Sequence, residues 1–442
     1  MARRNSRRQF LQTTAATGVG FWVAGGLRAE ESKSPNERIR MACVGVGNKG
    51  SSDSTDAGKH GEIVAICDID DNMLDSASKK QGFEQAKKYN DFRKMFDELG
   101  GSIDAVTVST PDHNHAAIAV MAMRLGKHCF CQKPLTHSLY EARVMAEVAR
   151  EKKVATQMGN QGTSYDPLRK AAAIIKAGTL GTVKEVHVWT DRPIWPQGED
   201  KLPSAPVPPH VHWDEWIGPA KYRPYAVGYH PFAWRGFWDF GTGALGDMAC
   251  HTVNMPFMAL NLRDPISVQA ETSGHNKDSY PGWSIIKFEF PANGNRPALS
   301  MTWYDGGKKP DASLLDGKQP EKSGSLVIGD KGKLYAPGDY AEKPLQMLGG
   351  ASEPKVEWIK SPGHFEEWVR AIKEGEPAMS NFPDYAVPLT ETILLGNLAV
   401  WAAPNKGEMG KKIEWDAKNL KATNAPEVEE VIRPKFREGY TL

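Results

Sequence analysis

The chain has 442 residues, of which 40% are hydrophobic and 25% charged, and its formal net charge is +1 at pH 7. This length suffices for two domains with separate cores, and the composition excludes a disordered or fibrous protein. Without the five arginines among the first 29 residues, the chain has 50 basic and 54 acidic residues, a charge of −4. A chain without a basic excess is not expected to bind nucleic acid.

The first 29 residues (1–29) have the features of an export signal. Arg7 and Arg8 precede an uncharged stretch at residues 9–27, which small residues follow. This pattern resembles a twin-arginine signal, whose machinery exports folded proteins. We therefore expect an exported, periplasmic protein that uses the twin-arginine machinery. A stable membrane anchor is not expected, because threonines and glycines dilute the apolar stretch below what a membrane span requires.

Residues 38–159 alternate short apolar runs with helical patterns. The apolar runs, each typical of a buried parallel strand, lie at residues 39–47, 62–69, 102–111, 127–134 and 153–160. One helical face is formed by Phe92, Met95, Phe96 and Leu99. A second helix is expected at residues 115–125, and a third begins at Ser138, where Glu141 completes a capping box. The alternation predicts an α/β fold with an N-terminal Rossmann domain, a doubly wound parallel sheet, at residues 36–160.

After residue 160 the pattern changes. Asp166 and Pro167 predict a helix start, because they supply a cap and a first-turn proline. A proline-rich loop follows at residues 192–212. Alternating strands are expected at residues 182–190, 266–271, 283–290, 298–303 and 325–334, and helices at 241–262, 364–374 and 385–401. Residues 161–442 are therefore predicted to form a C-terminal α/β domain with a large, mostly antiparallel open sheet.

The first apolar run leads into a GxGxxG pattern at Gly45, Gly47 and Gly50. Between a strand and a helix, Gly45 permits a tight turn and Gly47 lets the backbone approach a pyrophosphate. Gly50 allows the helix to pack close to the strand. The helix N-terminus offers N–H groups and a positive dipole end to the phosphates. Asn48 and Lys49, which lie between the glycines, are therefore also expected at the cofactor.

A carboxylate for the cofactor ribose is expected at the end of the second apolar run. Asp68 lies 18 residues after Gly50, near the ~20 residues typical of this fold. It would accept a hydrogen bond from the 2′-hydroxyl and repel a 2′-phosphate, so NAD is favoured over NADP. Ile69 is expected beside it at the cofactor, and Asp70 is the alternative carboxylate.

Residues 108–142 resemble the glucose–fructose oxidoreductase and inositol dehydrogenase (Gfo/Idh/MocA) family. The family motifs TPxxxH and EKP correspond to Thr110, Pro111 and His115, and to Gln132, Lys133 and Pro134. The resemblance covers the chain from residue 38 onward. It implies that these residues line a nicotinamide cofactor and that a second domain follows, whose open sheet often mediates oligomers. We therefore expect a homo-oligomer, a dimer or a tetramer.

The same resemblance implies a catalytic set of Lys133, Asp247 and His251. The residues agree with it, because positions four apart share one face of a helix. An imidazole suits a general base, and a lysine ammonium can stabilise the developing alkoxide or ketone oxygen. On the residues alone, the Asp247–His251 pair could instead be an exposed helix pair or an N-terminal polar contact.

Gln132 departs from the EKP motif. Glutamine keeps the hydrogen-bonding shape of glutamate but loses its charge. Lys133 would then have one anionic partner fewer. This change either tunes the acid–base step or marks a member with reduced or altered chemistry, and the sequence leaves both open.

Six of the 13 tryptophans lie at residues 189–238. Flat aromatic faces beside polar side chains suit a carbohydrate. Substrate contacts are expected from irregular segments and from the carboxyl edge of the parallel sheet, at Trp195, His230, Arg235, Asn160 and Gln161. The alternative interpretation is that most of these rings pack the proline-rich loop or a subunit interface.

No metal site is expected, because the cysteines at residues 129–131 lack a second pair. The sequence predicts an exported NAD-dependent oxidoreductase that acts on a hydroxyl of a sugar, polyol or glycoside by hydride transfer. Tight retention of the cofactor is expected, since no free NAD pool would restore it after export. The alternatives are a redox-neutral NAD-dependent glycosidase or lyase, which oxidises and then eliminates, and a non-catalytic sugar-binding relative.

Overall fold

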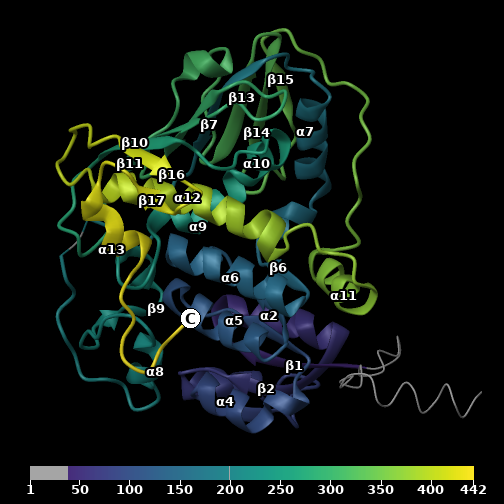
Figure 1. The fold of residues 1–442 in the computed structure, drawn as a ribbon, viewed down its shortest axis with the longest axis vertical. Helices are drawn as coiled ribbons and strands as arrows, with labels where there is room; N and C mark the ends of the chain where they lie inside the picture. The colour runs from purple at the N-terminus through teal and green to yellow at the C-terminus, as the bar shows by residue number, and fades with distance from the viewer. Residues whose placement is uncertain (1–37, 199) are drawn as a thin grey trace, which may run out of the picture. The chain divides into compact units, whose positions relative to one another are not determined.

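The computed structural model describes residues 38–198 and 200–442, which belong to one compact unit (Figure 1). The expected export signal at residues 1–29 lies outside the described residues. Within the described ranges, no helix is both long enough and apolar enough to cross a membrane.

The N-terminal half of the described chain contains a six-stranded parallel sheet in the order β3-β2-β1-β4-β5-β6. Its strands are β1 (Ile39–Val44), β2 (Gly61–Cys67), β3 (Lys87–Tyr89), β4 (Ala105–Val108), β5 (His128–Cys131) and β6 (Thr156–Met158). Its helices are α2 (Asn48–His60), α3 (Asp71–Ala77), α4 (Phe92–Leu99), α5 (Asp112–Arg124) and α6 (Leu139–Lys152). The strand order reverses beside β1, and sheets of this kind bind ligands at the carboxyl ends of the strands there. The predicted Rossmann fold is confirmed.

Strand β1 shows why this sheet is covered on both faces. Ala42 and Val44 belong to one buried cluster, and Met41 and Cys43 to another. Successive side chains of a strand point to opposite faces, so both faces of β1 are packed. All the cysteines of the described residues are likewise buried and free, as small apolar side chains would be.

The second sheet of the described chain has nine strands in the order β15-β14-β13-β7-β12-β11-β10-β16-β17. These are β7 (Val183–Trp189), β10 (Ser267–Thr272), β11 (Ser284–Phe290), β12 (Leu299–Tyr304), β13 (Gly324–Gly329), β14 (Gly332–Pro337), β15 (Gln346–Leu348), β16 (Ile413–Asp416) and β17 (Lys421–Ala422). Neighbours are antiparallel except for the parallel pair β7 and β12. The predicted open, mostly antiparallel sheet is therefore confirmed. Two short strands, β8 (Val227–Gly228) and β9 (His230–Pro231), pair separately.

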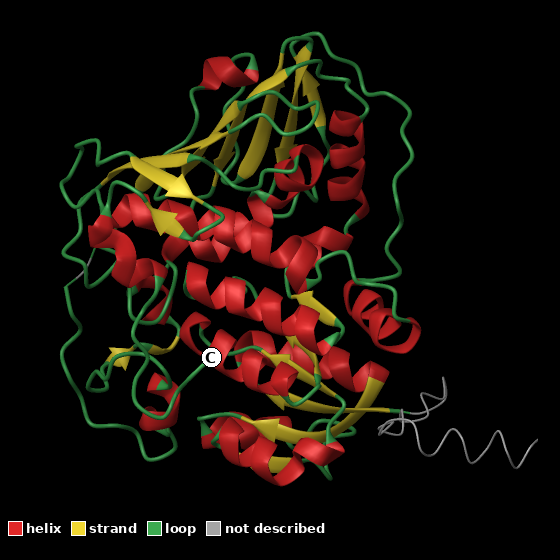
Figure 2. Cartoon of the chain, viewed as in Figure 1, coloured by secondary structure: helices red, strands yellow, loops and turns green. Residues whose placement is uncertain are grey.

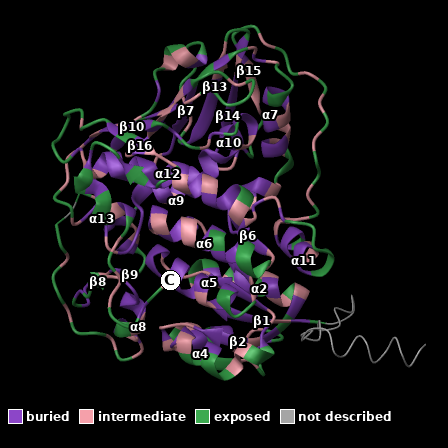
Figure 3. Cartoon of the chain, in the orientation of Figure 1, coloured by how far each residue is buried: buried purple, intermediate pink, exposed green. Residues whose placement is uncertain are grey.

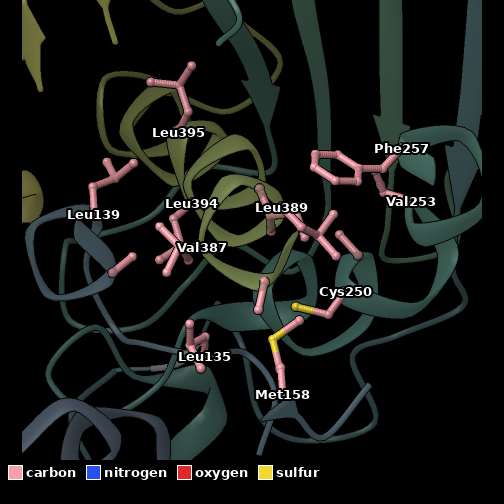
Figure 4. Packing of buried hydrophobic residues seen from close by; sticks show 14 of the residues in the cluster. Leu135, Leu139, Met158, Cys250, Val253, Phe257, Val387, Leu389, Leu394 and Leu395 are labelled. Atoms are coloured by element: carbon pink, nitrogen blue, oxygen red, sulfur yellow. The ribbon is translucent and has the colours of Figure 1, made fainter. Parts of the chain in front are cut away.

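Helix α12 joins the two domains. The helices of the C-terminal half are α7 (Asp166–Lys176), α8 (Trp213–Ile217), α9 (Gly243–Thr252), α10 (Asn254–Leu260), α11 (His364–Glu374), α12 (Val387–Trp401) and α13 (Glu429–Ile432). α12 packs against β10 and β11 on one side and against α6 on the other, and Figure 2 shows this helical layer between the two sheets. It is buried along most of its length (Figure 3). Leu389 and Leu394 of α12 belong to the same cluster of buried residues as Leu135 and Met158 of the Rossmann domain (Figure 4). The two domains thus share one core.

The helix starts match the sequence pattern in part. The capping box of Ser138 and Glu141 is formed at the start of α6. Helix α5 begins at Asp112, three residues before its expected start. The cap predicted at Asp166 is wrong: this residue is the first of α7, and its carboxylate accepts hydrogen bonds from Trp358 and Lys360.

Two elements were predicted wrongly. The single helix expected at residues 241–262 is divided into α9 and α10 at Val253. Pro256 has no N–H to bond the carbonyl one turn before it, and its ring crowds that carbonyl. The single strand expected at residues 325–334 is a hairpin, in which Gly329 pairs with Gly332 across the turn.

Candidate active site

The glycine turn after β1 leaves no room for side chains at two positions. Gly45 has φ +79°, and a Cβ there would lie 2.4 Å from the carbonyl oxygen of Ser109. A Cβ on Gly50 would lie 2.0 Å from the carbonyl oxygen of Gly45. At Gly47 the obstacle is a side chain, because a Cβ would lie 2.9 Å from atoms of Met73. The turn is therefore tight, and α2 packs directly on it.

Asp68 ends β2 opposite this turn. Its carboxylate accepts hydrogen bonds from the backbone N–H groups of Val46 (2.8 Å), Gly47 (3.2 Å) and Asp70 (3.0 Å). Burial raises the pKa of Asp68, while these hydrogen bonds and His230 act to lower it. Asp70 instead caps α3 by accepting from the N–H of Asn72 at 2.9 Å. Of the two carboxylates, Asp68 therefore faces the glycine turn.

A cavity of about 390 Å³ runs from the glycine turn to α9. Most of the residues predicted from the sequence line it. They are Gly45, Gly47, Asn48, Lys49, Asp68, Ile69, Thr110, Pro111, Gln132, Lys133, Gln161, Trp195, His230, Arg235, Asp247 and His251. The structure thus brings the expected cofactor residues and the expected catalytic residues to one site.

Three predicted residues do not line the cavity. Gly50 lies beneath the turn, for the reason given above. The ring nitrogens of His115 lie 2.9 Å from the carbonyl oxygen of Pro134 and 2.8 Å from that of Thr110, so its contacts are with the backbone of the cavity wall. Asn160 is fully buried and accepts a hydrogen bond from Ser380 at 2.5 Å. Direct contact of His115 with the cofactor and of Asn160 with the substrate is therefore not supported.

Lys133 and Asp247 form an ion pair at the far end of the cavity. Lys133 follows β5, and its Nζ donates to Asp247 Oδ1 at 2.7 Å and to the Asp247 carbonyl oxygen at 3.0 Å. The Nε of Arg235 lies 3.5 Å from the same Oδ1. Burial raises the pKa of Asp247, but the charges of Lys133 and Arg235 outweigh it and hold the pKa below its usual 3.8. The carboxylate therefore stays ionised and is shared by two cations.

His251 lies one turn of α9 after Asp247 and is only 2% exposed. Burial holds its pKa well below 6.5, and the charge of Lys133 lowers it further against the opposing charge of Asp247. Its Nδ1 has no hydrogen-bond partner among the described residues. The rings of His251 and Tyr340 are T-shaped to each other, with centroids 4.6 Å apart. A neutral imidazole therefore lines the cavity together with the ammonium of Lys133.

Aromatic rings surround the guanidinium of Arg235. It lies 4.3 Å from the ring centroid of Trp234, 5.0 Å from that of Phe232 and 5.9 Å from that of Trp195. Sequence reasoning missed other cavity residues, among them Arg192, Trp234, Tyr340 and Tyr440. Tyr340 comes from the loop between β14 and β15 and Tyr440 from the C-terminal segment, and no local pattern marks either as part of a site.

Residues 192–240, here called the arm, contain most of the tryptophan-rich stretch. The rings of Trp213 and Trp216 stack at 4.5 Å, and Tyr229 and Phe240 pack beside them in a buried cluster. These rings therefore pack within the arm, as the alternative interpretation expects of them. Trp195, Trp216 and Trp234 also line the cavity.

The arm lies across the carboxyl end of β2. The N–H of Asp71 donates to the carbonyl of His210, and the N–H of His212 to the carbonyl of Ile69, both at 2.9 Å. His230, expected at the substrate, instead lies 3.0 Å from the carboxylate of Asp70. Its place is therefore beside Asp68, at the expected ribose end of the cavity.

Residues 39–160 match the family described as oxidoreductase family, NAD-binding Rossmann fold, and residues 166–442 match its C-terminal alpha/beta domain. The chain belongs to the Gfo/Idh/MocA oxidoreductase family. NAD is accordingly its cofactor. The residues fit this group, because the glycine turn presents bare backbone and Asp68 presents a carboxylate to the same cavity.

Among similar proteins, the levoglucosan dehydrogenase of Pseudarthrobacter phenanthrenivorans is 25% identical over 43% of this chain and 40% of its own. A glycosyl hydrolase family 109 protein of Shewanella pealeana is 28% identical over 40% and 44%. The inositol 2-dehydrogenase of Salmonella typhimurium is 28% identical over 34% and 45%. The matches thus span less than half of each relative.

Solved structures share the fold. The WlbA dehydrogenase of Bordetella pertussis, in complex with NADH and UDP-GlcNAcA, is 18% identical with a TM-score of 0.59, covering 86% of this chain and 99% of its own. The aldose-aldose oxidoreductase of Caulobacter crescentus, complexed with glycerol, is 16% identical with a TM-score of 0.58, covering 86% and 100%.

Proposed function

We propose that this protein is an exported NAD-dependent oxidoreductase that oxidises a hydroxyl of a sugar, polyol or glycoside and keeps its cofactor bound between turnovers. One observation carries the activity: Lys133 and His251 reach the same cavity as the glycine turn. An ammonium and a neutral imidazole beside a dinucleotide site are the groups that oxidation of an alcohol requires.

Lys133 is the electrostatic group of this proposal. An ammonium has three N–H donors, and two of the contacts of Lys133 go to Asp247. One donor remains for a substrate hydroxyl oxygen. As that oxygen loses its proton, the ammonium stabilises the charge that develops on it, in a buried site where such an interaction is strong. Asp247 fixes the direction of the ammonium.

His251 is the general base. Because burial keeps its pKa well below 6.5, the imidazole is neutral at neutral pH and able to accept the hydroxyl proton. The proton passes from the substrate oxygen to a ring nitrogen, and the nearby carboxylate of Asp247 stabilises the imidazolium that results. NAD bound in this cavity would accept the hydride from the carbon that bears this oxygen.

A carbohydrate suits the substrate end for two reasons. Trp195, Phe232 and Trp234 offer apolar faces, and Arg235 and Gln161 offer hydrogen-bond donors. Similar proteins are named for dehydrogenases of levoglucosan and inositol and for an aldose-aldose oxidoreductase. The polar and aromatic lining and these names support a sugar or polyol.

Cofactor retention is supported by the arm. Its backbone bonds to Ile69 and Asp71, and its His230 contacts Asp70, so the arm lies across the expected adenosine end. Glu215 from the arm and Tyr440 from the C-terminal segment also line the cavity. Release of a dinucleotide would require these contacts to open.

The activity is tested by mixing purified protein with a panel of sugars and glycosides while the absorbance of the reduced nicotinamide is followed. We expect at least one sugar to reduce bound NAD in the natural protein. Lys133→Ala should bind NAD and fail to reduce it. Equal rates for the two proteins across the panel would overturn the catalytic assignment.

A second candidate is the redox-neutral glycosidase, which the similarity to glycosyl hydrolase family 109 proteins favours. Transient oxidation of a ring carbon acidifies the neighbouring C–H, so the glycosidic oxygen can be eliminated before the hydride returns. Release of free sugar from a glycoside without net reduction of NAD would select this function.

Retention and export have separate tests. Nucleotide released by denaturing the purified protein should approach one per chain, and its absence together with weak binding would contradict retention. For export, Arg7→Lys combined with Arg8→Lys should leave the protein in the cytoplasm, since the twin-arginine machinery reads this pair. Normal export of that variant would exclude this route.

A further inference from the structure

Asp53, on α2, is a buried charge that the reaction proposed above does not use. It is 1% exposed and does not line the cavity. Its Oδ2 accepts hydrogen bonds from Ser109 Oγ at 2.8 Å and from Gln132 Nε2 at 2.9 Å. Its Oδ1 forms an ion pair with Lys49. A buried carboxylate is stable only when partners of this kind satisfy it.

The amide of Gln132 lies between one hydrogen-bond donor and one acceptor. Its Oε1 accepts from the backbone N–H of Lys133 at 3.2 Å, and its Nε2 donates to Asp53. Gly159 leaves the amide its space, because a Cβ there would lie 2.4 Å from Nε2. A glutamate at this position would set a second carboxylate about where Nε2 lies, directly against Asp53. The glutamine in the EKP motif therefore matches a charge on the neighbouring helix.

The partners of Asp53 come from three segments that form the cavity wall. Lys49 belongs to the first turn of α2, Ser109 precedes Thr110, and Gln132 precedes Lys133. We propose that Asp53 is a positioning residue that holds these segments together beneath the cofactor, and that it requires a neutral hydrogen-bond donor at position 132. This requirement explains why glutamine replaces the glutamate of the EKP motif: the carboxylate at this place in the wall is supplied by Asp53 of α2 instead.

The other titratable groups near Asp53 are two cations and two thiols. Lys49 faces it from the same helix, Cys43 from β1 and Cys131 from β5, and Lys80 bonds α2 through the carbonyl of Ser51. Burial raises the pKa of Cys43 to about 12 and that of Cys131 well above 9.0. Both thiols are thus neutral at working pH, so a pH effect at position 132 reports on the carboxylates.

Four proteins test the proposal: the natural chain, Asp53→Asn, Gln132→Glu and the double variant. The measured quantities are the dissociation constant of NAD and the melting temperature without NAD, at pH 5 and pH 8. Neither measurement needs a substrate. The test can therefore fail or succeed independently of the proposed function, because only a kinetic measurement would depend on that function.

We expect Gln132→Glu to weaken NAD binding about tenfold at pH 8, since two adjacent carboxylates resist joint ionisation. The defect should shrink at pH 5, where one of them holds a proton and donates it to the other. Asp53→Asn alone should weaken binding by only about threefold, because its amide oxygen keeps the neutral hydrogen bonds while the ion pair with Lys49 is lost.

The decisive result is whether Asp53→Asn weakens or strengthens NAD binding, first in the natural chain and then in the Gln132→Glu variant. It should weaken NAD binding in the natural chain and restore it in Gln132→Glu, because the amide then donates to the new carboxylate. If Asp53→Asn is harmful in both, or if Gln132→Glu equals the natural chain at both pH values, the proposal is wrong. Should Asp53→Asn fail to fold, the pH dependence of Gln132→Glu alone decides.

Discussion

At the dinucleotide end of the cavity, the backbone sets the geometry. Gly45 and Gly50 approach other backbone atoms so closely that one added methyl group would collide with them. At the substrate end, charged side chains set it, since Asp247 is shared by Lys133 and Arg235. The first end is therefore expected to be sensitive to added atoms, and the second to removed charges. Variants at each end should separate cofactor binding from chemistry.

Lys133→Ala should have the largest effect. We expect kcat to fall about 10³-fold, the loss typical of a group that stabilises a developing oxyanion. The dissociation constant of NAD, measured by titration, should change little, because the glycine turn is intact. Lys49→Ala is the matched variant at the other end, and it should reduce NAD affinity more than kcat. Equal losses of affinity and kcat in Lys133→Ala would contradict the separation.

Gly45→Ala tests the dinucleotide end with an added methyl group. The strained backbone and the contact with Ser109 should together cost about 3 kcal/mol of stability, and NAD affinity should fall sharply. Gly126→Ala is the control, since Gly126 has a similar φ of +75° but open space around it. Chemical denaturation and NAD titration of both variants check this. Similar losses in the two would mean that backbone strain alone, not close packing, explains the glycine.

The buried His115, whose ring contacts the backbone at the dinucleotide end, should make the free energy of unfolding depend on pH in the acid range. Burial depresses its pKa from 6.5 to about 4, against its backbone hydrogen bonds to Pro134 and Thr110. Above pH 6.5 this histidine is neutral in both the folded and the unfolded chain. As pH falls from 6.5 to 4, only the unfolded chain takes up the proton, so the free energy of unfolding should fall by about 1.4 kcal/mol per pH unit.

His115→Gln should therefore lower the slope of unfolding free energy against pH in this range, as measured by urea denaturation. His212→Gln is the control, because its side chain is 37% exposed. An unchanged slope in His115→Gln would show that this residue does not contribute to acid unfolding.

The smallest effect is expected in the arm. His230→Ala removes a contact with Asp70, whose side chain is 5% exposed, and should speed NAD dissociation about threefold. His212→Ala removes a contact with the more exposed Asp71 and should leave dissociation unchanged, as exposed pairs contribute little. Stopped-flow displacement of NAD measures both rates. If neither rate changes, the arm does not retain the cofactor through this contact.

The two ends also differ in how far sequence predicts them. Gly45 and Gly50 act within one turn of the backbone, so their spacing between a strand and a helix predicted them. Asp247 and His251 share one helix, but their catalytic role was implied by the family resemblance. Lys133 meets Asp247 across 114 residues, and this pairing was implied by resemblance alone. The contact of Asp53 with Gln132 spans 79 residues and has no local signature. Predictions failed likewise where packing overrode pattern, as when His230 paired with Asp70.

The central claim is that Lys133 and His251 act on one substrate oxygen beside the nicotinamide. A crystal structure with NAD and a sugar that reduces it measures this directly. We predict that Lys133 Nζ and a ring nitrogen of His251 both lie within about 3.2 Å of one hydroxyl oxygen, on the carbon that faces the nicotinamide. A structure in which the two side chains contact different parts of the sugar, or in which the nicotinamide lies away from α9, would contradict the account.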